Sequence, residues 1–357
     1  MLQSAPSLFA DPAAIPPDAD WIDARAPDTA AAALERAGRF DPNAPIDLDA
    51  FDHWWRCEFD AAGPQRLVFH GLATLAELFV NGERRATSQS MFAPLQLDLD
   101  ARGRVRLDIA FRAMGPRLAA KTPRARWRPR AVQPSSLRFL RTTLIGRMPG
   151  WCPPIRAVGP YRAVELIDES ALRVDVARAL TRVEGRDGVV DLALRVNKNT
   201  ASIELSCAGL RQRVAVSDGW AIAALRIPDV ALWWPHTHGD PALHDLVAHI
   251  DGREIALARL GFRTIQLDRG ADGKGFGLLV NGVPVFCRGA NWIPADIVAL
   301  PGERDAHAPW LTLARDNADP VKDKWIIEAY STAMSSASEL DRDASRLYLE
   351  RFVKKGD

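Results

Sequence analysis

The chain has 357 residues and nearly balanced charge, with 46 Lys and Arg against 45 Asp and Glu, which gives a formal net charge of +1 at pH 7. This length has room for two or three domains, and the charge balance gives no sign of nucleic acid or an acidic membrane surface as a partner. No segment approaches membrane-spanning length, and the first twenty residues have neither the basic start nor the apolar run of a signal peptide. We therefore expect a soluble, cytoplasmic protein.

The cysteines are too scattered to predict a zinc site or a disulfide framework. None stands in a Cys-x-x-Cys pair, so the pattern favours isolated buried thiols. They are Cys57, Cys152, Cys207 and Cys287. A metal site is conceivable at three loop histidines, but no paired carboxylate or cysteine joins them in sequence, so we expect no metal and no cofactor. These are His236, His238 and His244.

The first 167 residues contain one good helix and several strands. Residues 28–37 predict a helix, with an Asp or Thr cap, an alanine run and Gly38 just after its end. Residues 52–59 and 67–80 are dense in strand-forming residues, and Asn81-Gly82 predicts a tight turn. From Arg104 to Arg112 apolar and polar residues alternate, which is typical of a strand with one buried face. Short strands with turn signals indicate a β-sandwich.

A long segment rich in Pro and Gly follows, between residues 123 and 161. Its four arginines invite interpretation as a nucleic-acid patch, but a solvated loop paired with local carboxylates explains them better, because the chain is nearly neutral and no stacking platform is interleaved. They are Arg124, Arg126, Arg128 and Arg130. Long loops of this kind are more often functional than filler.

A second all-β unit begins near Leu172. Its strands are predicted at 172–180, 189–197, 201–209 and 220–227, followed by a hairpin at 244–260. We expect Asp187-Gly188 and Asp251-Gly252 to form hairpin turns. A third hairpin is predicted between Phe276 and Val285, turning at Asn281-Gly282.

Several of these segments resemble glycoside hydrolase family 2, and the β-mannosidases in particular. The sequence NGVPVFCRGANWIPAD is similar to the passage from the sandwich domains of those enzymes into the first strand of their catalytic (β/α)8 barrel. The sequences FDHWWRCEF, GLATLAELFVNGE and RVRLDIAFR resemble their jelly-roll sugar-binding domain, over most of residues 21–167. LWWPHTHGDPALHDL resembles a loop of their immunoglobulin-like domain, and GFRTIQLDRGAD resembles the linker strand into the barrel.

The resemblance implies a fold class and a set of sugar contacts. We expect a mainly β chain: a jelly-roll sandwich at 1–167, an immunoglobulin-like sandwich at 168–263, an incomplete barrel start at 264–310 and a helical tail at 311–357. The partner would be a mannose-containing carbohydrate. Trp292 would stack on a pyranose face and Asp296 would accept hydroxyl hydrogen bonds, although core packing for Trp292 and turn capping for Asp296 are the plainer alternatives. Arg147 and Trp151 would contact the glycone from the jelly-roll loop.

The catalytic residues of that family are not found in the sequence. Retaining glycosidases need two carboxyl groups about 5 Å apart, and in family 2 both are glutamates on later barrel strands, the acid/base one directly after an Asn. The chain contains no Asn-Glu dipeptide, and fewer than a hundred residues follow Gly261, whereas a whole barrel takes about 250. We therefore assign no catalytic residue and expect a truncated, hydrolytically inactive chain. A carbohydrate-binding module and a subunit that associates with a separate barrel chain stay open as alternatives.

Residues after Leu300 lose the resemblance. Two amphipathic helices are predicted there, at 321–335 and 339–353. A lone barrel strand has no neighbours for its backbone, so we expect the part beyond residue 265 to be poorly packed or to lie against the second sandwich.

Overall fold

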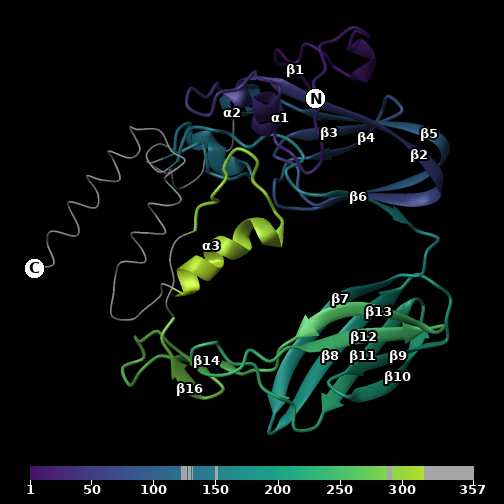
Figure 1. Cartoon of the computed structure of the whole chain (residues 1–357), viewed down its shortest axis with the longest axis vertical. Coiled ribbons are helices and arrows are strands. Elements are labelled where there is room, and N and C mark those ends of the chain that lie inside the picture. The colour runs from purple at the N-terminus through teal and green to yellow at the C-terminus, as the bar shows by residue number, and fades with distance from the viewer. Residues whose placement is uncertain (122–126, 128–129, 131, 149–151, 288–291, 317–357) are drawn as a thin grey trace, which may run out of the picture. The chain divides into compact units, whose positions relative to one another are not determined.

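The computed structural model describes residues 1–121, 127, 130, 132–148, 152–287 and 292–316 (Figure 1). The chain forms two compact units, the first made of Met1–Asp168 and Ala290–Asp357, and the second of Glu169–Gly289. The second unit is therefore inserted in sequence between two parts of the first. The described part is mainly β, as predicted.

A six-stranded sheet forms the first unit, in the order β1-β2-β5-β3-β4 with β6 also paired to β2. Its strands are β1 (Leu2–Ser4), β2 (Asp52–Phe69), β3 (Ala76–Val80), β4 (Glu83–Ser88), β5 (Leu95–Phe111) and β6 (Val164–Asp168). Short helical segments connect them: η1 (Pro12–Ala14), α1 (Ala30–Arg36), η2 (Leu48–Ala50), α2 (Met114–Ala119) and η3 (Ser135–Phe139).

The two long strands of this sheet organise the unit. β2 and β5 pair along their whole length, from His53 opposite Phe111 to Phe69 opposite Leu95. The prediction of separate strands at 52–59 and 67–80 was therefore wrong at this point. Because β2 pairs with β5 along its whole length, it continues without interruption to Phe69. The strand ends there, and β3 begins at Ala76.

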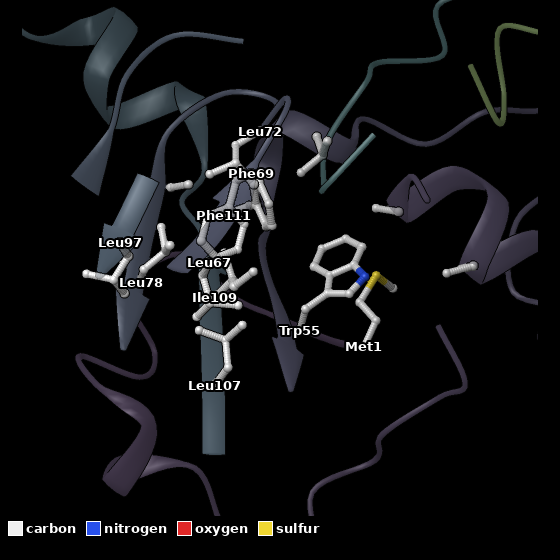
Figure 2. Packing of buried hydrophobic residues seen from close by; sticks show 14 of the residues in the cluster. Met1, Trp55, Leu67, Phe69, Leu72, Leu78, Leu97, Leu107, Ile109 and Phe111 are labelled. Carbon is white, nitrogen blue, oxygen red and sulfur yellow. The ribbon is translucent and has the colours of Figure 1, made fainter. Parts of the chain in front are cut away.

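The core of the first unit lies on the inner face of these long strands. Figure 2 shows side chains of β2 and β5 packed together, with Met1 beside the indole of Trp55. Trp55 also meets Phe111 edge to face at 5.0 Å between ring centroids, an arrangement that adds to the stabilisation from burial. The labelled members of this cluster are Met1, Trp55, Leu67, Phe69, Leu72, Leu78, Leu97, Leu107, Ile109 and Phe111.

Local signals in the first unit act as the sequence predicts. Helix α1 begins after Thr29, whose Oγ1 accepts a hydrogen bond from the Ala32 N–H at 3.1 Å, and Gly38 follows the helix with a φ of +69°. The Asn81-Gly82 turn between β3 and β4 has positive φ at both residues, 51° and 87°, which is the type I′ geometry of a two-residue hairpin.

The second unit is built on one seven-stranded sheet in the order β13-β12-β9-β10-β11-β8-β7. Its strands are β7 (Val174–Glu184), β8 (Asp187–Val196), β9 (Ser202–Cys207), β10 (Leu210–Ser217), β11 (Trp220–Ile227), β12 (His244–Ile250) and β13 (Arg253–Leu260). The two ends of the curled sheet are in contact: the Thr181 hydroxyl on β7 donates to the carbonyl of Gly261, just after β13. One apolar core, with Leu192, Leu205 and Phe262 fully buried, fills the space inside.

The turn between β7 and β8 corrects one prediction. Asp187 and Gly188 do not form the turn but begin β8, while Gly185, with a φ of +64°, supplies the positive φ of the turn. Gly188 is needed for a different reason: a Cβ there would lie 2.7 Å from both Phe262 and Val230. The Asp251-Gly252 turn between β12 and β13 is confirmed, with φ of 50° and 74°.

A small sheet follows in the second unit, in the order β14-β15-β16. Its strands are β14 (Ile265–Asp268), β15 (Gly277–Val280) and β16 (Val283–Val285). The Asn281-Gly282 turn is confirmed, with φ of 51° and 78°. The Asn281 side chain accepts from the Thr264 N–H at 2.9 Å and donates to the Trp233 carbonyl at 3.1 Å, so this sheet is fastened to the loop before β12.

Beyond the small sheet the described chain ends in helix α3 (Arg304–Asp316). The helical tail predicted from residue 311 overlaps only the end of α3, which begins seven residues earlier and contains Pro309, a residue that interrupts the backbone hydrogen bonding of a helix. The helices predicted at 321–335 and 339–353 lie outside the described residues. None of the helices in the described part of the chain is long and apolar enough to cross a membrane.

The four cysteines are all free thiols, as predicted, but only Cys207 is buried. Burial raises the pKa of its thiol to about 11. Cys57 and Cys287 are exposed, so the prediction of buried thiols was wrong for them. Cys57 lies on the same face of β2 as core residues, opposite Leu107, but its side chain is not covered there, and Cys287 follows the exposed end of β16.

Candidate functional site

Residues 292–300, here called the docked segment, pack against the first unit. Ile297 and Val298 pack on its main apolar core, and Leu300 is buried in a small cluster with Ala73, Met91, Ala157 and Tyr161. The hydroxyl of Thr29, at the start of α1, donates to the Val298 carbonyl. The expectation that everything beyond residue 265 packs poorly or lies against the second sandwich was therefore wrong for the docked segment.

Trp292 stands at the start of the docked segment with about half of its surface exposed. Its relative exposure is 47%, so it is not the core residue that the plainer alternative supposed. One edge contact holds it, a T-shaped pairing with His307 of α3 at 6.1 Å between ring centroids. His307 is itself fixed by a 2.7 Å hydrogen bond between Nε2 and the Pro301 carbonyl. An indole that is braced along its edge and open on much of its surface can offer a flat apolar face to a ligand.

Asp296 caps the turn that follows it. Its Oδ1 accepts hydrogen bonds from the Val298 and Ala299 N–H groups, both at 2.9 Å. The side chain is exposed, and a carboxylate has acceptor capacity on both oxygens. The capping role foreseen as the alternative is thus present, and it uses Oδ1.

Arg147 lies in a buried ion pair. Its Nε and Nη2 donate to the two carboxylate oxygens of Asp49 at 2.9 and 2.7 Å. Nη2 also donates to the Ala157 carbonyl at 3.2 Å, and Nη1 to the Thr143 carbonyl at 3.4 Å. Only 3% of the Arg147 side chain is exposed. This guanidinium therefore ties the polypeptide on both sides of residues 149–151 to η2, and its predicted contact with a glycone stays a prediction.

A second arginine, Arg156, lies beside the same segment, η2. Arg156 contacts Asp47, the N-cap of η2, and approaches Asp49 at 3.7 Å. Ala157, next in sequence, accepts from Arg147 and packs against Leu300. The structure thus connects Arg147 to the docked segment through Ala157, whereas Trp151, the fourth predicted contact, lies outside the described residues.

The residues that hold this site were not found from the sequence. Thr29 is an ordinary cap residue in the sequence, and Asp49 and Leu300 have no distinguishing neighbour in sequence. Thr29 carries a helix-cap signal that could have drawn attention to it, but nothing local shows its bond to Val298, 269 residues away.

The loop histidines show no metal arrangement among the described residues. The His244 Nε2 is hydrogen-bonded to the Ala231 carbonyl at 3.0 Å, and the His238 Nδ1 to the Thr237 hydroxyl at 2.8 Å. No three His, Cys, Asp or Glu side chains gather in the described ranges as a metal ion would require.

The fold and the sequence both have known relatives. The family model for the glycosyl hydrolase 2 galactose-binding domain-like domain matches residues 13–162. Beta-mannosidase B of Aspergillus flavus is 29% identical over 270 residues, which cover 69% of this chain and 32% of that protein. The chain has the N-terminal region of a β-mannosidase-like family 2 glycoside hydrolase.

Other relatives of this β-mannosidase-like chain agree with the assignment. Beta-mannosidase B of Aspergillus clavatus is 30% identical over 270 residues, again covering 69% of this chain and 32% of that protein. The chain therefore spans about a third of the length of the curated relatives it matches.

Solved structures support the fold. The beta-D-mannosidase of Dictyoglomus thermophilum superposes with a TM-score of 0.71 at 20% identity, over 88% of this chain and 44% of that one. The exo-chitosanase CsxA of Amycolatopsis orientalis gives 0.60 at 17% identity, over 93% and 42%. At these identities the likeness shows the fold of the β-mannosidase-like chain and not its substrate.

Proposed function

We propose that the chain is the non-catalytic sandwich part of a β-mannosidase-like glycoside hydrolase and that it contributes sugar contacts from the docked segment. The observation that carries the proposal is Trp292, which is half exposed on a segment that is otherwise anchored in the first unit. Asp296, four residues further on, is exposed, and its second carboxylate oxygen, which takes no part in the turn cap, would accept from sugar hydroxyls. The resemblance adds Trp151 and Arg147 as glycone contacts, and a cytoplasmic location belongs to the same proposal.

The two catalytic carboxylates would come from a barrel outside these 357 residues. Two features support this: the sequence has no Asn-Glu dipeptide, and the curated relatives, whose name is beta-mannosidase B, are about three times as long as the matched part. A terminal β-mannose residue is the substrate that this name suggests. The 357-residue polypeptide alone is then expected to give no turnover of an aryl β-mannoside, and turnover at a rate above buffer would overturn this part of the proposal.

Sugar binding is tested by calorimetry with β-1,4-mannobiose. Because a stacking aromatic ring contributes about 1 kcal/mol, we expect Trp292→Ala to raise the Kd about fivefold. Asp296→Asn keeps an oxygen to cap the turn and removes the charge, so it should weaken binding without loosening the turn. The matched control is Trp220→Ala, which removes another partly exposed Trp, from β11 of the second unit. Equal affinities for the Trp292→Ala and wild-type chains would contradict the role of Trp292.

A second candidate function is association with a separate barrel-containing chain, and the small sheet of the second unit favours it. Cross-strand partners share a face of a sheet, and the register places Ile265 beside Val280 and Val283, and Leu267 beside Leu278 and Val285. One face of this sheet is thus wholly apolar, and its members range from half exposed to buried: Ile265, Leu267, Leu278, Val280, Val283 and Val285. The opposite face is mixed: it carries Gln266 and Asp268 beside Leu279 and Pro284.

The partner that fits this apolar face is the barrel part of a family 2 enzyme. In the curated relatives the matched third is continuous with the remaining two thirds of the same chain, and exposed apolar surface of this kind marks an interaction site. We expect Ile265→Ser with Leu267→Ser to abolish co-elution with a separately produced barrel portion of such an enzyme in gel filtration. The control pair, Gln266→Ser with Asp268→Ser on the opposite face, should leave co-elution intact. A wild-type chain that never co-elutes with the barrel portion would refute the association.

A further inference from the structure

One hydroxyl group serves both α1 and the docked segment. Thr29 is completely buried. Its Oγ1 accepts from the Ala32 N–H at 3.1 Å, which caps α1, and donates its proton to the Val298 carbonyl. A hydroxyl has one donor and two acceptor positions, so both bonds are made at once.

Thr29 and Asp296 are both hydrogen-bonded to the backbone of Val298. The Val298 carbonyl accepts from Thr29, and the Val298 N–H donates to Asp296 Oδ1 at 2.9 Å. The orientation of this one residue therefore fixes the Asp296 carboxylate relative to the start of α1. A change at Thr29 reaches Asp296 through two hydrogen bonds.

Leu300 is a second anchor at the end of the same segment. Its φ is +49°, a left-handed conformation that costs an L-residue roughly 1–2 kcal/mol. It is nevertheless buried to 9% exposure against Ala73, Met91, Ala157 and Tyr161. A strained residue persists only where its surroundings over-determine it, so this packing fixes the backbone between Asp296 and the Pro301 carbonyl that His307 uses to brace Trp292.

We propose that Thr29 is a positioning residue for sugar binding: through Val298 it sets the place of Asp296, and together with Leu300 it holds the segment that presents Trp292. This inference rests on the function proposed above. Thr29 touches no sugar itself. Its effect passes entirely through the docked segment.

The two roles of Thr29 can be separated by substitution. Thr29→Asp keeps an oxygen that accepts from Ala32 and suits the positive end of the helix dipole, but an ionised carboxylate has no proton to donate and repels the Val298 carbonyl. Thr29→Ser keeps both the donor and the acceptor and is the matched control. Leu300→Ala removes the second anchor without touching α1, and it carries the test if Thr29→Asp does not fold.

The test combines amide hydrogen exchange with calorimetry on the 357-residue chain. In Thr29→Asp we expect exchange at Val298 and Ala299 to speed up at least tenfold while amides of α1 keep their protection, and the Kd for β-1,4-mannobiose to rise about tenfold. Thr29→Ser should match the wild type in both measurements, and Leu300→Ala should reproduce the loosened exchange. A role as helix cap alone would leave Val298 and Ala299 protected in Thr29→Asp, and that result, or unchanged exchange in both anchor variants, overturns the inference. If the wild-type chain binds no mannobiose, the proposed function fails, and exchange alone still decides whether Thr29 holds the segment.

Discussion

Replacement of Asp49 by alanine is expected to lower the free energy of unfolding of the first unit by about 3–5 kcal/mol, because it leaves the Arg147 guanidinium buried without its counter-charge. Both side chains are at least nine-tenths buried. The two hydrogen bonds between them, at 2.7 and 2.9 Å, have the bidentate geometry that makes Arg–carboxylate pairs strong. Urea unfolding followed by circular dichroism measures the change.

The control for this prediction is an exposed ion pair of the same unit. Glu58 on β2 and Arg104 on β5 form an ion pair at 3.1 Å, and both are about half exposed. Glu58→Ala should therefore cost no more than about 1 kcal/mol. The double variant Asp49→Ala with Arg147→Met leaves no unpaired charge and should recover much of the lost stability. If Asp49→Ala is no worse than Glu58→Ala, the buried pair does not fasten η2 to the residues around Arg147.

The stability of the first unit is expected to fall as the pH drops from 6.5 to about 4, because of His53. This imidazole is completely buried on β2, and burial lowers its pKa from 6.5 to about 4. Its Nε2 is hydrogen-bonded to the Leu48 carbonyl at 3.0 Å, while Nδ1 has no partner among the described residues. A protonated ring would therefore carry a second, unsatisfied donor into the core.

The sign follows from proton binding. Above pH 6.5 the ring is neutral in the folded and unfolded chains, and the full stability is present. Between pH 6.5 and 4 only the unfolded chain takes up the proton, so the free energy of unfolding falls by about 1.4 kcal/mol per pH unit, or about 3 kcal/mol in all. Below pH 4 this residue adds no further loss.

The pH effect is measured by urea unfolding at half-unit steps. His53→Gln keeps an N–H that can reach Leu48 and cannot titrate. Between pH 6.5 and 4 its free energy of unfolding should therefore fall by roughly 3 kcal/mol less than that of the wild type. Glu58→Ala again serves as a control, since it alters an exposed group and leaves His53 in place. A wild-type and a His53→Gln chain with parallel stability curves would show that His53 is not the titrating group.

Local chemistry made much of the fold predictable. Asn81-Gly82, Asp251-Gly252 and Asn281-Gly282 turn where expected, because a residue that tolerates positive φ stands at each turn position. Asp187-Gly188 is the same dipeptide as Asp251-Gly252 but does not form a turn. There the glycine is required by Phe262, 74 positions later in the sequence, and local pattern does not distinguish a glycine needed for a turn from one needed for packing.

The site was predictable only in part for a related reason. Trp292 and Asp296 were named from their resemblance to a family segment, and the structure adds that one is half exposed and the other caps its own turn. The residues that hold them depend on contacts between distant positions: Thr29 with Val298, and Asp49 with Arg147, 98 residues apart. Such pairings follow from the sheet topology and leave no local trace.

The insertion of the second unit within the first has a consequence for synthesis. The continuous stretch from Glu169 to Gly289 has all of its own strands once it leaves the ribosome. In the first unit, Ile297, Val298 and Leu300 can cover part of its apolar surface only after Leu300 has emerged. A nascent chain stalled shortly after residue 289 would therefore carry a complete later unit while the earlier one still lacked the side chains that cover part of its apolar surface.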